Sequence, residues 1–187
     1  MKNFLVAVVV LVSLASPAFA QSSTSFWVEE QNIVSDSGSS PWINGLVSHK
    51  LDEKLGIYAW FQIGEGWAQA YVGPTYSPSS WLQVGAGVGL EQADNPERFG
   101  TFVWMGRGRC SLLSLYEDGG GDHWYKSEFN VKATGWLGAG AIVQHMLGVG
   151  PRVELNIPGT PVMVWGAPLY DWSTGRFNGI LAARVSF

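Results

Sequence analysis

Residues 176–187 constrain the fold of this chain more than any other segment. They read RFNGILAARVSF. In an extended strand, successive side chains point to opposite faces. One face of this segment is then apolar and consists of Phe177, Gly179, Leu181, Ala183, Val185 and Phe187. The other face is largely polar and consists of Arg176, Asn178, Ile180, Ala182, Arg184 and Ser186. The segment therefore predicts a strand between an apolar and a polar environment, in which an arginine is tolerated better at Ala182 than at Leu181.

This segment resembles the closing strand of bacterial outer-membrane β-barrel proteins, which ends on an aromatic residue that their assembly machinery recognises. The resemblance covers the last twelve residues and names no particular family. It implies that Phe187 is an assembly signal, that the barrel-assembly machinery is a partner, and that outer-membrane lipid surrounds the protein.

The N-terminal residues predict export. A basic residue, Lys2, precedes an apolar run over residues 4–14, and small residues follow at Ala18 and Ala20. This order is typical of a cleaved secretory signal, and the run is too short to cross a bilayer as a helix. We therefore expect a signal peptide over residues 1–20 and a single β-barrel domain over residues 21–187.

The composition excludes several classes of protein. The only cysteine, Cys110, cannot form an intramolecular disulfide, and with three scattered histidines it makes a metal site improbable. We predict no cofactor, and no nucleic-acid partner because no Lys/Arg cluster occurs. Charged residues make up only 14% of a chain that has 24 glycines and ten tryptophans. The tryptophans lie mainly near the ends of the candidate segments, as in an interfacial girdle. Without a helix-length apolar run after residue 20, this composition favours a membrane β-barrel.

Alternation of apolar and polar residues recurs along the chain, with Gly, Pro, Asn, Asp or Ser between most of the alternating segments. The candidate strands lie at residues 26–34, 42–51, 55–63, 67–76, 82–91, 98–105, 109–118, 124–133, 136–145, 149–157, 162–170 and 176–187. We predict an all-β, antiparallel, up-and-down outer-membrane barrel of about 12 strands, an even number as bacterial barrels require. Ten strands remain if the first two segments are loops, and eight if ambiguous segments merge.

Two local patterns add detail. Glu29 and Glu30 are adjacent, so one of them must face the apolar side of the first strand. Gly85, Gly87 and Gly89 share one face of a strand whose other face is apolar. Glycine is unfavourable in a strand unless something approaches the backbone closely, so we expect large side chains from opposite strands to cover this stripe.

The polar faces carry charges of both signs, five positive and three negative. The predicted lumen-facing charges are Glu91, Lys126, Glu128, Lys132, Arg152, Glu154, Arg176 and Arg184. They can pair across a narrow lumen as a structural network, or they can line a water-filled path that favours anionic solutes. We favour the network, because few long loops exist to shape a constriction.

Two other functions are weighed against a structural or porin-like barrel. One is an outer-membrane lipid-modifying enzyme. Its nearest Ser/His/acid set, His123, Ser127 and Glu128, fails because residues four apart on a strand lie about 13 Å apart. His49 and His145 are interpreted as rim residues, and no catalytic residue is predicted. The other is a soluble periplasmic β-barrel or sandwich with an apolar ligand inside, which shows the same alternation with inside and outside exchanged. The oligomeric state is left open.

Overall fold

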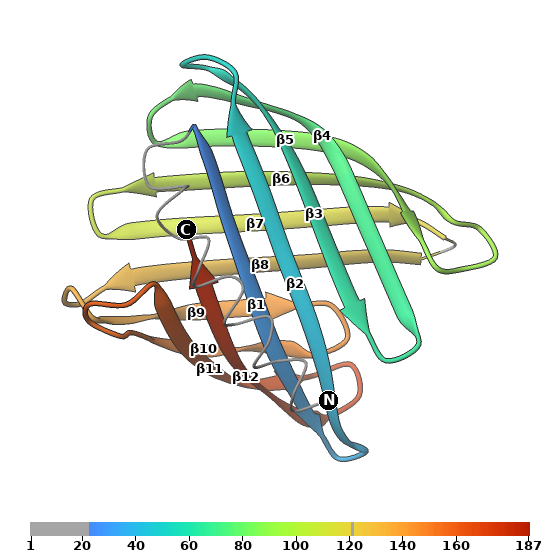
Figure 1. Cartoon of the computed structure of the whole chain (residues 1–187). Coiled ribbons are helices and arrows are strands. Elements are labelled where there is room, and N and C mark those ends of the chain that lie inside the picture. The colour runs from blue at the N-terminus through green and yellow to red at the C-terminus, as the bar shows by residue number, and fades with distance from the viewer. Residues whose placement is uncertain (1–22, 121) are drawn as a thin grey trace.

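Twelve antiparallel strands close into one barrel in the computed structural model, which describes residues 23–120 and 122–187 (Figure 1). The strands are β1 (Thr24–Ser35), β2 (Gly38–Lys50), β3 (Leu55–Gly64), β4 (Trp67–Ser79), β5 (Leu82–Glu91), β6 (Glu97–Arg107), β7 (Cys110–Gly119), β8 (Asp122–Lys132), β9 (Leu137–Gln144), β10 (Gly148–Asn156), β11 (Val162–Asp171) and β12 (Arg176–Ser186). The predicted signal peptide, residues 1–20, lies outside the described residues.

Each strand pairs with its neighbours in sequence, and β1 pairs with β12 to close the ring. In this closing pair, Val28 faces Val185 and Ile33 faces Ile180. Closure leaves no sheet edge with unpaired backbone groups, which a sheet in lipid cannot tolerate. The predicted up-and-down barrel of about 12 strands is confirmed, and the alternatives of eight and ten strands are wrong. The alternatives failed because the first two segments, despite the adjacent Glu29 and Glu30, form two of the longest strands.

Both rims of the barrel are short. We call the end where β1 begins and β12 ends the terminal rim, and the other end the distal rim. The longest connections are residues 157–161 at the terminal rim and residues 92–96 at the distal rim. In the β2–β3 turn at the terminal rim, Asp52 Oδ1 accepts hydrogen bonds of 2.7 Å from the backbone N–H groups of Leu55 and Lys54. These two donors lower the pKa of Asp52. In the described residues no helix is long and apolar enough to cross a membrane.

Apolar side chains cover the outside of the barrel, and charged side chains lie inside it. Leu181 is 64% exposed and Val88 66% exposed, whereas Glu29 is 1% and Arg152 is 3% exposed. A soluble barrel shows the reverse distribution, because its apolar face forms the core. The predicted alternative of a soluble periplasmic barrel or sandwich is therefore wrong, and the outer surface is that of a barrel that spans a membrane.

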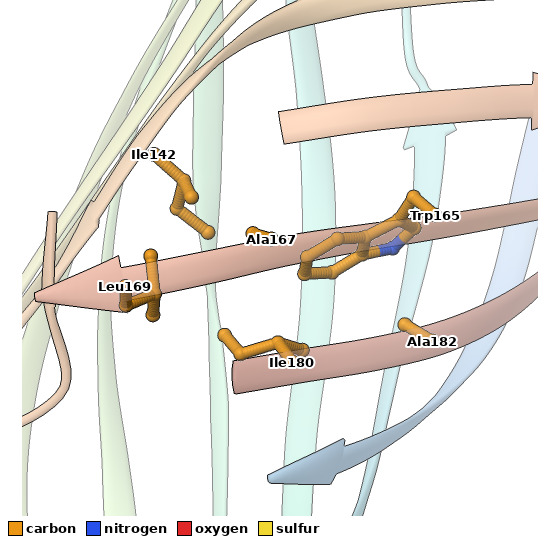
Figure 2. Packing of buried hydrophobic residues seen from close by; sticks show 6 residues of the cluster. All are labelled: Ile142, Trp165, Ala167, Leu169, Ile180 and Ala182. Atoms are coloured by element: carbon orange, nitrogen blue, oxygen red, sulfur yellow. The ribbon is translucent and has the colours of Figure 1, made fainter. Parts of the chain in front are cut away.

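Part of the interior is nevertheless apolar. Figure 2 shows this cluster on β9, β11 and β12, and its members are Ile142, Trp165, Ala167, Leu169, Ile180 and Ala182. The alternation of the last strand correctly assigned Ile180 and Ala182 to the inner face. Because Ala182 packs in this cluster, an arginine there would overpack the interior, and the structure does not support the prediction that Ala182 tolerates an arginine better than Leu181 does.

The tryptophans divide between the rims and the interior. Trp81, Trp136 and Trp172 are exposed in turns at the rims, as in an interfacial girdle. Trp60 and Trp165 are instead buried inside the barrel. Spacing along the sequence placed the tryptophans mainly near segment ends, and these two depart from that pattern because they pack against lumen side chains.

Candidate functional site in the barrel lumen

The lumen contains a cavity of about 530 Å³, which lies within the range of small-molecule sites. On β8, the lining residues run from Trp124 to Lys132, so the cavity follows nearly the whole strand. On β1 they run from Ser25 to Gln31. Two kinds of side chain face each other across this space, and we name them the charged wall and the aromatic wall.

The charged wall consists of ion-paired side chains and a tryptophan on β8, β10, β11, β12 and β1. Its members are Glu29, Lys126, Glu128, Arg152, Glu154, Trp165 and Arg184. The centre of the wall is Glu128. Its carboxylate lies 2.6 Å from Lys126 Nζ and accepts a hydrogen bond of 2.7 Å from Arg152 Nη1. Both cations also lie over the ring of Trp165, at 5.5 Å for Lys126 Nζ and 4.3 Å for the Arg152 guanidinium carbon.

Glu29 holds the other part of the charged wall. Its Oε2 accepts a bond of 2.8 Å from Arg184 Nε and another of 2.8 Å from Trp165 Nε1. Its Oε1 accepts a bond of 2.5 Å from Gln31 Nε2. A carboxylate that is 1% exposed is thus compensated by one cation and two neutral donors.

The aromatic wall consists of Tyr58, Trp60, Tyr71 and Phe102, on β3, β4 and β6. Tyr58 and Phe102 pack edge to face with ring centroids 5.1 Å apart, and Trp60 and Tyr71 lie 5.6 Å apart. In the ring of twelve strands, β4 stands six strands from β10. Tyr71 therefore lies across the lumen from Arg152.

The glycine stripe of β5 lies beneath the aromatic wall, as predicted. A Cβ atom at Gly85 would collide with the ring of Phe102, and one at Gly87 would lie 2.6 Å from the Tyr58 hydroxyl oxygen. A Cβ at Gly89 would lie 2.8 Å from Tyr71. The covering side chains come from β3, β4 and β6, on the same side of the barrel as β5, so the prediction that opposite strands supply them is wrong.

A second polar cluster lies between the aromatic wall and the distal rim. Arg98 donates to Glu91 Oε2 at 2.6 Å and to the Tyr71 hydroxyl at 2.9 Å. The Tyr71 hydroxyl in turn donates to Glu117 Oε2 at 3.0 Å, and Gln69 donates to the same oxygen at 3.1 Å. This cluster fixes the position of Tyr71 in the aromatic wall.

Several buried polar atoms in the cavity lining make no hydrogen bond to described residues. They are the side-chain oxygens of Gln31, Asn44, Asn130 and Gln144, and Nε and Nη2 of Arg152. Arg152 Nη2 nevertheless lies 3.5 Å from Glu154 Oε2, within ion-pair distance. Each of these atoms is itself buried, so water or a solute reaches it only when neighbouring side chains move.

Six of the eight predicted lumen charges line the cavity: Lys126, Glu128, Lys132, Arg152, Glu154 and Arg184. Glu91 lies near the distal rim, where it also accepts a bond of 2.5 Å from Trp67 Nε1. Arg176 is exposed at the first position of β12.

Sequence reasoning missed Glu29, Glu117, Arg98 and Lys50. Glu29 shares its face with Gln31, and Arg98 shares its face with Gly100, so the alternation along each strand was the available signal. Lys50 and Lys132 are exposed at the terminal rim, and neither forms an ion pair within residues 23–120 and 122–187.

The side chains considered for catalysis do not come together. Ser127 Oγ donates to Ser114 Oγ at 2.9 Å, Glu128 faces the lumen, and His123 is exposed beside the ring of His145. His49 Nδ1 lies 2.8 Å from Thr24 Oγ1 and 3.3 Å from Ser23 Oγ at the terminal rim. Within the described part of the chain, no carboxylate is bonded to His49. In the same part, no group of three or more His, Cys, Asp or Glu side chains could hold a metal ion.

Comparisons with known proteins give structural neighbours and no sequence relatives. No protein-family model and no curated protein matches the chain. The solved structure of a KdgM porin in complex with disordered oligogalacturonate matches with a TM-score of 0.58 at 12% identity, over 86% of this chain and 99% of that one. The outer membrane protein Omp33 of Acinetobacter baumannii matches with a TM-score of 0.54 at 11% identity, over 89% and 100%. A NanC porin matches with a TM-score of 0.52 at 9% identity, over 84% and 98%.

The chain thus has the fold of porin-like outer-membrane β-barrels. Together with the apolar outer surface, this fold confirms the predicted resemblance and the outer-membrane location, where lipid surrounds the barrel.

Proposed function

We propose that this barrel is a narrow channel through the outer membrane for small anionic solutes, acidic saccharides above all. One observation carries the proposal. A single cavity is bounded on one side by Lys126, Arg152 and Arg184 with their partners Glu29, Glu128 and Glu154, and on the other by a wall of aromatic rings.

The two walls match the two chemical parts of an acidic sugar. The faces of aromatic rings carry partial negative charge, and the C–H groups of a pyranose ring carry partial positive charge, so the sugar ring packs on Trp60 and Tyr71. Lys126, Arg152 and Arg184 suit the carboxylate of the sugar, which would exchange with the glutamates that now pair with them. The side-chain amides of Gln31, Asn44, Asn130 and Gln144 line the cavity and can exchange hydrogen bonds with sugar hydroxyls. The structural neighbour in complex with oligogalacturonate supports the same class of solute.

The terminal rim adds an attraction for anions. Lys50 and Lys132 line the cavity at this end without an ion-pair partner among the described residues. Unpaired charges at the mouth of a narrow path raise the local concentration of the opposite charge. An anion that enters here meets the charged wall next.

Uptake into liposomes tests the proposal. Vesicles that contain the folded barrel should take up digalacturonate faster than maltose, a neutral sugar of similar size. Equal rates for both sugars would contradict selection by charge. Vesicles with the heat-denatured protein serve as the control for leakage.

A second candidate, a closed structural barrel, is favoured by the pairing within the lumen. Glu128 and Glu29 engage Lys126, Arg152 and Arg184, and the cluster of Figure 2 fills part of the interior. No uptake of either sugar by vesicles with correctly folded barrel would favour this candidate.

We also propose Phe187 as an assembly signal that the barrel-assembly machinery recognises. Its backbone N–H donates to Phe26 O at 2.8 Å, Phe26 N–H donates back at 3.1 Å, and their rings stack at 6.3 Å. Deletion of Phe187 should lower the amount of heat-modifiable barrel in the outer membrane while export continues. Unchanged assembly would contradict the proposal.

A further inference from the structure

The distal rim of the barrel is acidic. Its exposed carboxylates lie in turns or within two residues of a strand end, and they are Asp36, Glu65, Asp94, Glu97, Asp118 and Asp122. In the described part of this rim, Arg176 is the only exposed Lys or Arg. Arg98 is buried there and lies within ion-pair distance of both Glu91 and Glu117, so one guanidinium faces two carboxylates. The distal rim therefore has a net negative charge.

The terminal rim is basic. Its exposed cations are Lys50, Lys54, Arg107, Arg109 and Lys132. None of these cations forms an ion pair with the residues that the structure describes. The exposed side-chain carboxylates of this rim are Asp52 and Glu53, and Phe187 adds the C-terminal carboxylate. The cations outnumber these three carboxylates, so the terminal rim has a net positive charge.

The charges of the two rims act on ions separately. Strands of about ten residues rise about 3.3 Å per residue and tilt by about 35–45°, which puts the rims about 25 Å apart. The Debye length is about 10 Å at 0.1 M salt, so the charge of one rim is largely screened at the other. Between the rims, the cations of the charged wall pair with its carboxylates. An ion therefore meets opposite net charges at the two mouths of the barrel.

We propose that this polarity makes the barrel conduct ions better in one direction than in the other, an inference that rests on the proposed function as a channel. Each mouth concentrates ions of the opposite charge, so anions enter readily at the terminal rim and cations at the distal rim. A voltage that makes the distal side positive drives both ions in through the mouth that attracts them, and the lumen fills with ions. The reverse voltage drives both ions toward the mouth that repels them, and the lumen is depleted.

The same polarity makes the two entrances unequal for an anionic solute. At the terminal rim the solute first meets Lys50 and Lys132, which line the cavity. At the distal rim it first meets carboxylates that carry no Lys or Arg partner among the described residues, such as Asp94 and Asp118. A passive channel does not change an equilibrium, so the difference shows in currents that a voltage drives.

Single-barrel currents in potassium chloride test the proposal, because the two ions have similar mobilities in water. Cys110, exposed at the start of β7 on the terminal rim, is labelled with a biotin maleimide. Streptavidin then lowers the current only from the chamber that faces the terminal rim, which identifies the orientation. At about 0.1 M salt, the current should be at least about twofold larger with the distal side positive, since surface potentials reach several kT. At about 1 M salt, where the Debye length is about 3 Å, the two currents should be nearly equal.

Neutralisation of the distal carboxylates tests the cause of the asymmetry. The distal variant combines Asp94→Asn, Glu97→Gln, Asp118→Asn and Asp122→Asn. Its ratio of the two currents at low salt should fall close to one. Unheated gel mobility shows that the variant is folded. If it fails to assemble, Asp36→Asn with Glu65→Gln, which changes only turn residues, should still lower the ratio.

The matched control makes the same type of substitution at the opposite rim. Asp52→Asn with Glu53→Gln removes negative charge from the terminal rim, so the ratio should stay the same or rise. Equal currents at low salt in the unmodified sequence, a larger current with the distal side negative, or an unchanged ratio in the distal variant would overturn the proposal and leave the channel intact. A folded barrel that carries no current at either voltage would overturn it together with the proposed function.

Discussion

The two walls of the lumen stabilise their buried side chains in different ways. On the charged wall, each buried carboxylate is held by a cation at a specific distance, as Glu128 is by Lys126 and Arg152. On the aromatic wall, the rings of Tyr58 and Phe102 are held by packing against each other and against the β5 glycines. The first wall depends on every partner being present, because an unpaired buried charge is costly. The second wall depends on how closely its rings fill the space above the β5 glycines.

This difference also separates two properties of the proposed channel, its ion selectivity and its binding of saccharides. Paired charges hold the charged wall together, with Arg152 between Glu128 and Glu154. Aromatic rings offer a surface without a net charge. Changes to the charged wall should therefore alter both stability and ion selectivity. Changes to the aromatic wall should alter stability and saccharide binding and leave ion selectivity unchanged.

The largest effect is expected for Glu128→Ala. The change leaves Lys126 and Arg152 buried without their shared carboxylate, and breaking such a pair costs about 3–5 kcal/mol. Urea unfolding in lipid vesicles measures the loss. Glu65→Ala, in the exposed β3–β4 turn, is the matched control and should change nothing. A cost no greater than the ~1 kcal/mol of a surface ion pair would show that the charged wall is not a buried network.

The next largest effect is expected when a charge is added to the lipid face, which tests whether the charged side chains face the lumen. Leu181→Arg puts a cation on the lipid face at the middle of β12 and should cost about 2–4 kcal/mol. Ser48→Arg adds the same charge to the cavity lining near the terminal rim and should be tolerated. Heat-modifiable barrel in the outer membrane is the measure. Equal losses for both variants would undermine the inside and outside assignment.

A smaller effect is expected on the aromatic wall for Gly87→Ala. The added methyl would lie 2.6 Å from the Tyr58 hydroxyl oxygen and 2.8 Å from Val72 O, which is backbone. Overpacking of this kind costs about 1–3 kcal/mol. Gly135→Ala, where nothing lies within 4 Å of the new methyl, should be neutral by the same unfolding assay. An equal response at the two glycines would remove the crowding argument.

The smallest effect on stability is expected for Lys50→Glu combined with Lys132→Glu. This double substitution should nevertheless change ion selectivity clearly. Neither lysine is ion-paired within the described residues, so unfolding should be unchanged. The reversal potential in a salt gradient should shift toward cations, because the mouth of the cavity becomes acidic. The combination Lys50→Arg and Lys132→Arg keeps the charge and serves as control. An unchanged reversal potential in the Glu variant would place the selectivity elsewhere.

Alternation predicted the barrel and most of its lumen charges because a two-residue period fixes the face of every side chain. It could not find partners across strands. The pairing of Glu29 with Arg184 joins the first and last strands, and the contact of Arg98 with Tyr71 depends on the tilt of β4 and β6. Both follow from closure of the sheet, which no single strand reveals.

Two other differences between the sequence-based predictions and the structure have physical causes. Trp60 and Trp165 lie on the inward faces of β3 and β11. Their positions along the sequence alone suggested an interfacial girdle instead. Arg176 has the phase of a lumen residue, but it is the first residue of β12 and remains exposed at the distal rim. The alternation along a strand predicts which face of the sheet a side chain occupies. Its depth along the barrel axis also depends on the register between strands, which the alternation does not give.

Single-channel recording in planar bilayers tests the central claim most directly. We predict a small conductance with a preference for anions, and brief interruptions of the current by digalacturonate that are rarer with maltose. Trp60→Ala should shorten these interruptions without a change in ion preference. A folded, inserted barrel that carries no current, or one that both sugars interrupt equally, would contradict the account.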